Sequence, residues 1–570
     1  MNPAMFWKIS CGVLGAGLLL AAGLSSPGGL EAALGRPAGI LTWGPSLFRA
    51  LLAFHGLAAL YVAMQPRRLT QPAEGATRPP FLLAEAASGR VWLLLALLTA
   101  IGLGLRLWRL DLSMWVDEVL TAAFFVRPPL GEIISSYPFQ NQHLLYSLAA
   151  HATVAWFGES ASSLRLPAVV LGVASIPALY LLGRRAVSLQ VTLAAAALMT
   201  FSYHHIWFSQ NARGYSGILF FAMVSTWFWL RALEDDRGWD WIGFVVATVA
   251  GLGIHMTMLF VTLSQMLIHA GMLAYDRPAA PRVRKPFFAY LLAGTLTLQL
   301  YALALPELLK SGTKEVSLPS EWTKPLWLLQ AMVMNFGAGG LGLLVVAAGG
   351  AVALVGFLSI AKRNRAAALI FALPPVIGAA VVIASGHNLW PRFFFFAMGF
   401  GLLIVMEGVS VIVAQAATIA GRPRTASKLA ALATTLVVVA SAATVPRCYR
   451  YPKQDFTGAR DWVEQNRSAG EPAVAVGTAG IVYKNYYAPQ WTVIDDAAGL
   501  ETLHGRSPSP WLVYTLPIEV RTYRPEIWRI IEKEYRPVRI FPGTLQGGGE
   551  IYVCRRIVPP AGPLPGGKTP

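Results

Sequence analysis

The stretch Val91–Trp108, VWLLLALLTAIGLGLRLW, is an apolar run with a single arginine, and Trp115-Val116-Asp117-Glu118 follows it closely. An apolar run of about 20 residues is long enough to cross a bilayer as a helix. Two adjacent carboxylates just beyond such a helix lie at the membrane surface, where an acidic group can deprotonate an acceptor or hold a cation. The simpler alternative is a charge pair that ends the helix and faces water. The stretch therefore indicates a membrane helix with a candidate site at its end.

The composition of the whole chain is that of a membrane protein. Of its 570 residues, 55% are hydrophobic and only 13% are charged, and the mean hydropathy is +0.52. The net charge of +17 does not indicate nucleic-acid binding, because the lysines and arginines lie in short loops between apolar runs, where they orient a membrane protein. The cysteines Cys11, Cys448 and Cys554 show no metal-ligand spacing. Cys448 and Cys554 could pair outside the membrane, but two free thiols are the favoured interpretation.

Apolar runs of spanning length recur along the chain and predict a mainly α fold, a polytopic bundle of about thirteen membrane helices. The expected starts are Ile9, Leu41, Val91, Leu166, Leu189, Tyr215, Trp241, Thr257, Phe288, Gly339, Ala367, Phe393 and Leu429. Basic residues gather on one side of this bundle, in the loops 67–90, 184–185, 277–285, 362–365 and 422–428. By the positive-inside rule that side is cytoplasmic, so Asp117, Glu118 and everything after Val445 are expected on the extracytoplasmic side.

This orientation depends on how the short apolar run Leu144–Phe157 is interpreted. The run has His143, Ser147 and His151 at a spacing of four residues, which is typical of one face of a helix. We interpret it as an amphipathic helix in the outer interface, within one long outer loop, because a further span would break the alternation of basic loops. The two histidines are interpreted as polar-face residues rather than as metal ligands.

The expected organisation has five parts. Residues 1–64 form two additional N-terminal spans, 65–90 a Pro-rich cytoplasmic linker, 91–445 the membrane core with its outer loop 109–165, 446–558 a small extracytoplasmic α/β domain, and 559–570 a disordered tail. The first run is expected to stay as a helix rather than to be cleaved as a signal peptide, because no convincing Ala-x-Ala site follows it.

Alternating short strands and helices predict the α/β character of the C-terminal part. Strands are expected at Ala473–Val476, Trp491–Ile494, Trp511–Thr515 and Ile551–Cys554. Helices are expected at Gln454–Ser468, near Ile481–Tyr487 and at Glu519–Tyr535. This part shows no convincing glycine-rich phosphate fingerprint.

The order of several short motifs supports a family resemblance. They are Trp115-x-Asp117-Glu118-x-x-Thr121, Asn141-Gln142-His143-Leu144-Leu145-Tyr146, Phe157-Gly158-Glu159, Leu164-Arg165-Leu166-Pro167, Leu182-Gly183-Arg184-Arg185 and Ser209-Gln210-Asn211-Ala212-Arg213-Gly214-Tyr215. With this order, roughly residues 91–445 resemble the GT-C glycosyltransferases of the protein O-mannosyltransferase-like group, which includes bacterial polyprenyl-phosphate-sugar transferases and the lipid A aminoarabinose transferases. The chain departs from the group at 142–145, where relatives usually have His-Pro-Pro-Leu or a proline-containing equivalent.

The resemblance implies a hexosyl- or pentosyl-type glycosyltransferase in the bacterial inner membrane. The donor would be a sugar on a polyprenyl phosphate, and the acceptor a hydroxyl or phosphate of a protein, lipid or glycan on the extracytoplasmic side. Asp117 would act as the base in an inverting direct displacement, while Glu118 orients the loop or binds the acceptor. No cofactor is implied with certainty. Some GT-C enzymes use a divalent metal ion, but a lone acidic pair is a poor cage for Mg²⁺.

The departing phosphate needs cations at the outer ends of the spans. Arg165, Arg213 and Arg392 are the candidates, since the planar guanidinium donates two hydrogen bonds at once to a phosphate. The alternative for each is an anchor at the level of the lipid headgroups. Further substrate-binding candidates in or near the motifs are His143, Gln210, Tyr215 and His255.

Two other classes of membrane protein remain open from the sequence. A transporter of lipid-linked sugars would also have many spans, but it usually shows internal repeats and charges near the midplane, which are not evident here. A polysaccharide polymerase or ligase would use the same lipid-linked substrates, but its large outer loop is expected late in the chain. Convergence of Asp117, Arg213 and Arg392 on one cavity would favour the glycosyltransferase.

Overall fold

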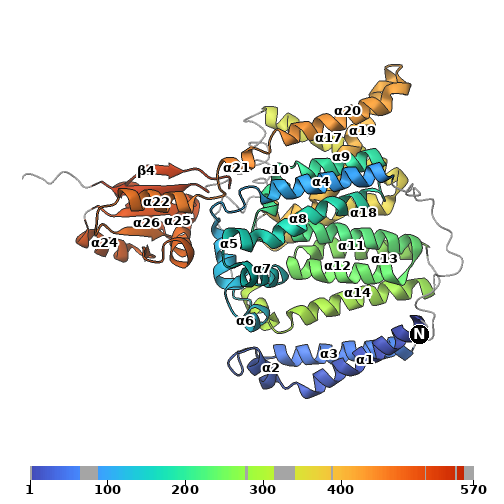
Figure 1. Cartoon of the computed structure of the whole chain (residues 1–570), viewed down its shortest axis with the longest axis horizontal. Helices are drawn as coiled ribbons and strands as arrows, with labels where there is room; N and C mark the ends of the chain where they lie inside the picture. Colours follow the sequence, from blue (N-terminus) through green and yellow to red (C-terminus); the bar gives the residue numbers. More distant parts are fainter. Residues whose placement is uncertain are drawn as a thin grey trace, which may run out of the picture.

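The computed structural model describes residues 3–64, 88–276, 280–312, 340–386, 389–507, 509–545 and 549–557. These residues form a large helical bundle with a small α/β domain beside it (Figure 1). Most of the expected linker 65–90 and the whole of the expected disordered tail 559–570 lie outside the described residues.

The bundle has a helix at each position where the sequence predicts a span (Figure 1). These helices are α1 (Pro3–Leu24), α3 (Gly44–Met64), α4 (Gly89–Leu107), α8 (Ala161–Gly183), α9 (Leu189–Thr200), α11 (Tyr215–Asp235), α12 (Gly238–Ile254), α13 (Met258–Asp276), α14 (Ala280–Tyr301), α17 (Gly340–Arg363), α18 (Arg365–Ala384), α19 (Met398–Ile419) and α20 (Ala426–Ala442).

Not all of these helices are long and apolar enough to cross a membrane. Among the described residues ten qualify, or eleven if α14 and the following α15 (Leu305–Gly312), bent at 86°, form one span. Within the described residues, thirteen helices lie at the expected positions, and ten or eleven of them meet this measure. At about 1.5 Å per residue, α9 and α12, with 12 and 17 residues, fall short of the hydrocarbon thickness on their own. The chain is nevertheless a multi-pass membrane protein.

Helices α1 and α3 pack against each other along one edge of the bundle (Figure 1). They approach closely at two glycines, since a Cβ atom on Gly15 would lie 2.8 Å from the carbonyl oxygen of Gly56. A contact of 3.1 Å between His55 Nε2 and Thr295 Oγ1 links this pair to α14.

The segment between α4 and α8 folds into short helices at one end of the bundle. These are α5 (Val116–Thr121), the π-helix η2 (Ala122–Val126), α6 (Leu130–Ser135) and α7 (Leu144–Phe157). Helix α7 is too short to span, as expected, but its polar stripe does not face the membrane interface. His143 and Ser147 are buried, and His151 Nδ1 lies 2.6 Å from the carbonyl oxygen of Val126. The expected outward polar face is therefore wrong, because His143 and His151 find their partners inside the protein and Ser147 is buried.

The C-terminal domain contains a five-stranded sheet with the strand order β2-β1-β3-β5-β4. The strands are β1 (Ala473–Val476), β2 (Thr492–Ile494), β3 (Trp511–Thr515), β4 (Tyr535–Phe541) and β5 (Ile551–Arg556). Strands β2, β1 and β3 are parallel, and β5 pairs antiparallel with β3 and β4. The helices are α21 (Arg447–Arg450), α22 (Phe456–Asn466), α23 (Thr478–Val482), the π-helix η5 (Tyr483–Tyr487), α24 (Ala497–Arg506), α25 (Pro517–Tyr523) and α26 (Pro525–Glu534).

The four predicted strands are present, but the sequence did not reveal β4 or α24. Strand β4 is an exposed edge strand with a register shift between Pro537 and Arg539, so its charges and proline resemble a loop. The helix expected at Glu519–Tyr535 is divided in two, because Pro525 begins the second helix. Cys11, Cys448 and Cys554 are all free thiols, as the favoured interpretation held.

Candidate active site

The two adjacent carboxylates open helix α5 and lie in very different surroundings. Successive residues of an α-helix are rotated by about 100°, so neighbouring side chains point in different directions. The side chain of Glu118 is 0% exposed, whereas that of Asp117 is 16% exposed.

Glu118 is held by a dense set of donors. Arg165 Nε donates to its Oε1 and Arg165 Nη2 to its Oε2, both at 2.7 Å. The backbone N–H of Ala212 donates to Oε1 at 2.7 Å, and that of Trp115 donates to Oε2 at 3.3 Å. The carboxylate thereby ties the start of α5 to the start of α8 and to the turn before α11.

Arg165 uses the rest of its guanidinium in the same way. Its Nη1 donates to the carbonyl oxygens of Leu110 and Leu112 at 2.8 and 2.7 Å, and its Nη2 donates to that of Ser113 at 3.3 Å. All three nitrogens of this buried arginine are therefore engaged inside the protein. The structure places Arg165 beneath the segment before α5, with no donor left for a phosphate.

Lys453, from the segment that leads into the C-terminal domain, lies on the other side of Glu118. Its Nζ is 4.0 Å from Glu118 Oε2 and donates to the carbonyl oxygen of Gln210 at 2.5 Å. Burial lowers the pKa of the Lys453 ammonium to about 7, against the opposing attraction of Glu118. Burial alone would raise the pKa of Glu118, but Arg165 and Lys453 outweigh it and hold that pKa below its ordinary value.

Asp117 has no comparable set of partners. Within the described residues no hydrogen bond reaches its carboxylate, and its nearest opposite charge is Arg392, whose Nη1 lies 3.7 Å from Asp117 Oδ2. That separation is longer than a direct hydrogen bond. The Arg392 guanidinium lies over the rings of Trp115 and Trp390, at 5.8 and 4.9 Å from their centroids. Both charged groups thus keep hydrogen-bonding capacity for a ligand.

Arg213 and His143 form the adjoining wall. Arg213 Nη1 donates to Thr121 Oγ1 at 3.1 Å, at the end of α5, and its Nη2 lies 3.0 Å from His143 Nε2. Asn141 accepts from the same guanidinium through its backbone and side-chain oxygens at 2.6 and 2.5 Å. Burial, reinforced by Arg213, holds the pKa of His143 well below its ordinary value, so the ring is neutral.

The remaining candidates fall into two groups. The rings of Tyr215 and His255 pack next to His143, with centroids at 5.7 and 4.5 Å, and so belong to the same wall. Gln210 instead donates from Nε2 to the carbonyl oxygens of Arg106 and Trp108 at 3.1 and 2.7 Å, which fixes the end of α4.

The residues of the site therefore form two sets. We call the set around Asp117 and His143 the face, and the buried set that holds the segment before α5 in place the foundation. The face contains Asp117, Arg392, Arg213, His143, Tyr215 and His255. The foundation contains Glu118, Arg165, Gln210 and Lys453. Sequence reasoning missed three residues: Asn141, Lys453 and, in the C-terminal domain, Glu519. Lys453 and Glu519 lie in no motif and approach the acidic pair only through tertiary packing. Asn141 lies in one of the family motifs, but no sequence pattern assigned it a role.

No metal site is built from the described residues. Within this part of the chain no three His, Cys, Asp or Glu side chains lie together as a metal-binding group. The ion-pair partner of Asp117 is Arg392, and a guanidinium is not a metal ligand.

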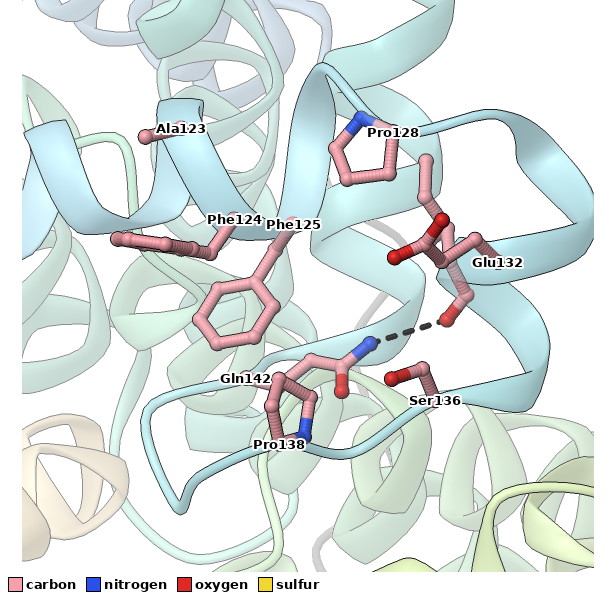
Figure 2. Close-up of a pocket in the computed structure, with 9 residues that line it drawn as sticks. Ala123, Phe124, Phe125, Pro128, Glu132, Ser136, Pro138 and Gln142 are labelled. Atoms are coloured by element: carbon pink, nitrogen blue, oxygen red, sulfur yellow. Dashed lines mark hydrogen bonds between the residues drawn. The ribbon is translucent and has the colours of Figure 1, made fainter. Parts of the chain in front are cut away.

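A separate hollow lies between η2 and α6. It is lined by Ala123, Phe124, Phe125, Pro128, Glu132, Ile133, Ser136, Pro138 and Gln142 (Figure 2). The amide of Gln142 points across this hollow and donates from Nε2 to the carbonyl oxygen of Ile133 at 3.0 Å (Figure 2). Asp117 and Arg392 are not among its lining residues.

Residues 142–305 match the sequence profile of the family described as dolichyl-phosphate-mannose-protein mannosyltransferase. Over these residues the match confirms the resemblance to the protein O-mannosyltransferase-like group. The matched segment is under a third of the chain and begins after the acidic pair, but it includes His143, Arg165, Gln210, Arg213 and His255. A comparison of the sequence with curated proteins gives no match.

Several solved structures are similar in overall shape to this chain. ArnT from Cupriavidus metallidurans in the apo state has a TM-score of 0.49 and 11% identity, with 83% of this chain and 99% of that chain covered. The same enzyme bound to undecaprenyl phosphate has a TM-score of 0.46 and 12% identity, with 84% and 100% covered. The oligosaccharyltransferase AglB from Archaeoglobus fulgidus, in complex with an inhibitory peptide and a dolichol-phosphate, has a TM-score of 0.48 and 12% identity, with 79% and 72% covered. None of these transfers a role to an individual residue here.

Proposed function

We propose that the protein transfers a sugar from a polyprenyl-phosphate donor to an acceptor hydroxyl or phosphate, with Asp117 as the general base. One observation carries this proposal. Of two adjacent carboxylates, Glu118 is saturated with donors, whereas Asp117 has an unbonded carboxylate facing a half-buried arginine. Among the described residues, the Asp117 carboxylate accepts no hydrogen bond and has only the Arg392 guanidinium nearby, at 3.7 Å, so its oxygens keep their accepting capacity for a ligand. The family match over 142–305 supports the same class.

The reaction needs little covalent work from the protein, because phosphate is a good leaving group. Asp117 takes the proton of the acceptor hydroxyl while the hydroxyl oxygen forms a bond to the anomeric carbon. The bond from that carbon to the phosphate oxygen breaks, and polyprenyl phosphate departs with the electron pair. One displacement inverts the anomeric centre and needs no carboxylate nucleophile.

Arg392 is the proposed cation for the departing phosphate. Its Nε has no partner in the described residues, and its Nη1 is 3.7 Å from Asp117. Before the donor binds, the guanidinium offsets the charge of Asp117. When the donor binds, the guanidinium turns to the phosphate, which leaves Asp117 free to accept a proton.

The buried groups have positioning roles in this proposal. Glu118 and Arg165 hold the segment 110–118 in place, and Arg213 holds α5 against His143 and Asn141. Arg165 is thus reassigned from phosphate binding to positioning. Placement matters because a shift of about 1 Å at a reacting group can cost about a hundredfold in rate.

The donor, acceptor and location follow from the resemblance to the family. Among the proteins of similar shape, ArnT has been solved bound to undecaprenyl phosphate, and AglB in complex with a dolichol-phosphate. We propose a polyprenyl-phosphate-linked sugar as donor, and the bacterial inner membrane with the site on the extracytoplasmic side as location. A transporter is less well supported, because the charged set lies at the ends of helices and not at the midplane.

The test is Asp117→Asn, which preserves the shape of the side chain but cannot take up the proton. Transfer by the purified enzyme in lipid should fall by about 10²–10⁴-fold, while binding of polyprenyl phosphate stays near the wild-type value. Asp111→Asn is the matched control, since Asp111 is an exposed acid of the same loop. A wild-type transfer rate for Asp117→Asn would remove Asp117 as the base and return the acidic pair to a helix stop at the interface.

A further inference from the structure

The parallel part of the C-terminal sheet contains a topological switch point. The chain passes from β1 to β2 on one side of β1, and then crosses to β3 on the other side. The chain then leaves β3 toward β4, so the connections after β1 and after β3 run in opposite directions. In open α/β sheets, the crevice outside the carboxyl ends of two such strands is where ligands bind.

Each of the two strands that flank this switch point is followed by a residue with a positive φ and, shortly after, by a polar side chain. Gly477 directly after β1 has φ +62°, and Leu516 directly after β3 has φ +49°. A non-glycine residue in the left-handed region is strained, and such strain gathers at functional sites. The two turns bring Thr478 and Glu519 together, so that Thr478 Oγ1 donates to Glu519 Oε2 at 2.6 Å.

This edge of the sheet is docked on the acidic helix of the bundle. Helix α23, which begins at Thr478, packs against α5. Gln454 bridges the two parts, since its Oε1 accepts from the backbone N–H of Val116 at 3.0 Å and its Nε2 donates to Thr515 Oγ1 at 2.9 Å. Figure 1 shows α5 on the side of the bundle that faces the small domain, with α25 at the near end of that domain.

The charges of the two parts interact across this junction. Burial raises the pKa of the Glu519 carboxyl, Asp117 raises it further, and Arg392 opposes both. Glu519 accepts from Thr478, which begins the helix packed against α5, so geometry also places Glu519 at the junction with the helix that contains Asp117. At this junction Asp117 and Glu519 are both hydrogen-bond acceptors, for different hydroxyls of one molecule.

We propose that the junction between α5 and the ends of β1 and β3 binds a polyhydroxylated acceptor, a sugar, and that Glu519 is the residue that positions it. The proposal rests on the proposed function and deepens it. Asp117 deprotonates the attacking hydroxyl, Glu519 accepts a hydrogen bond from a neighbouring hydroxyl, and Thr478 orients Glu519. Two carboxylates at one junction suit an acceptor with several hydroxyl donors better than a lone hydroxyl on a peptide.

The experiment uses the full-length enzyme in lipid vesicles, with a polyprenyl-phosphate-linked sugar as donor and the envelope fraction of a deletion strain as the acceptor source. Glu519→Gln and Thr478→Val are compared with Glu526→Gln, an exposed acid of the same domain. We expect Glu519→Gln to raise the acceptor KM by about ten- to a hundredfold, the loss typical of one charge-assisted hydrogen bond. Thr478→Val should raise it less, while donor KM and binding of polyprenyl phosphate stay unchanged in both.

Competition identifies the chemistry of the acceptor. Methyl glycosides should inhibit transfer by the wild-type enzyme, and should inhibit Glu519→Gln less, whereas tetramethylammonium chloride should have no effect on either. Inhibition by the cation alone would overturn the proposal in favour of a cationic acceptor, and an unchanged acceptor KM in Glu519→Gln would overturn it outright. If Asp117→Asn is inactive but Glu519→Gln behaves as wild type, only this proposal fails. If Asp117→Asn is fully active, the proposed function itself fails.

Discussion

Replacing Glu118 by Gln tests whether this acid acts by holding the site together. The substitution preserves the shape of the side chain but removes the negative charge that faces Arg165. The amide also turns one acceptor oxygen into a donor, which must then face either Arg165 Nη2 or the backbone N–H of Ala212. Breaking a buried ion pair by removing one partner usually costs about 3–5 kcal/mol, because the other charge stays buried.

The structure favours the lower end of that range. Arg165 keeps its bonds to the carbonyl oxygens of Leu110, Leu112 and Ser113, so its charge is not left without acceptors. We therefore expect Glu118→Gln to lower the free energy of unfolding by about 3 kcal/mol. Because the same bonds hold Asp117 in place, transfer should also fall, by up to about a hundredfold, although Asp117 is intact.

The measurement is thermal unfolding of the purified protein in detergent, followed by tryptophan fluorescence, together with transfer kinetics. The matched control is Glu159→Gln, which removes an acid of the same loop from a pair with Arg127 whose side chains are 31% and 40% exposed. An exposed pair of this kind contributes at most about 1 kcal/mol. A double variant, Glu118→Leu with Arg165→Met, should be less destabilised than the sum of its single changes. If Glu118→Gln unfolds at the temperature of the wild type, the positioning role of the pair is refuted.

Three further outcomes are expected. Arg392→Lys should raise the KM for the lipid donor, and Arg392→Ala should cost about 1.5–3 kcal/mol of donor binding; unchanged donor kinetics in the alanine variant would make this arginine a membrane anchor. Reporter fusions after Arg185 and Lys285 should be cytoplasmic and a fusion after Pro452 extracytoplasmic, and a cytoplasmic signal after Pro452 would contradict the orientation. The pKa of Lys453 is about 7 in the folded protein and 10.5 ordinarily. Between these pH values the unfolded chain therefore binds more protons than the folded protein, so the free energy of unfolding should rise with pH from about 7 to 10.5. Lys453→Met should lack this rise in thermal unfolding, and parallel profiles for the two proteins would show that the lysine does not titrate there.

The apolar runs and the basic loops determined where the helices lie, because a membrane helix is specified by local composition and length. Strands β1 and β3 were also predictable from the sequence, because buried parallel strands appear as short continuous apolar runs. The edge strand β4 was not, because its side chains are mostly exposed and its pattern is that of a loop. Likewise the histidine stripe of α7 showed a polar face but not whether protein or lipid headgroups would cover it.

The sequence alone located the acidic pair, but only the tertiary structure distinguished its two members. The partners of Glu118 come from Arg165 and Ala212, 47 and 94 residues away, and no local pattern shows which of two neighbouring carboxylates will meet them. The same packing removed Arg165 from the set of free cations and brought Lys453 and Glu519 toward the pair. A hydrogen-bond donor or a charge acts over a few ångströms of space, whereas a sequence motif records only separation along the chain. The residue type of Asp117 and its position after a membrane helix were therefore enough to predict a role as a base. Whether its carboxylate is left without hydrogen-bond donors was decided by contacts that form only when distant segments fold together.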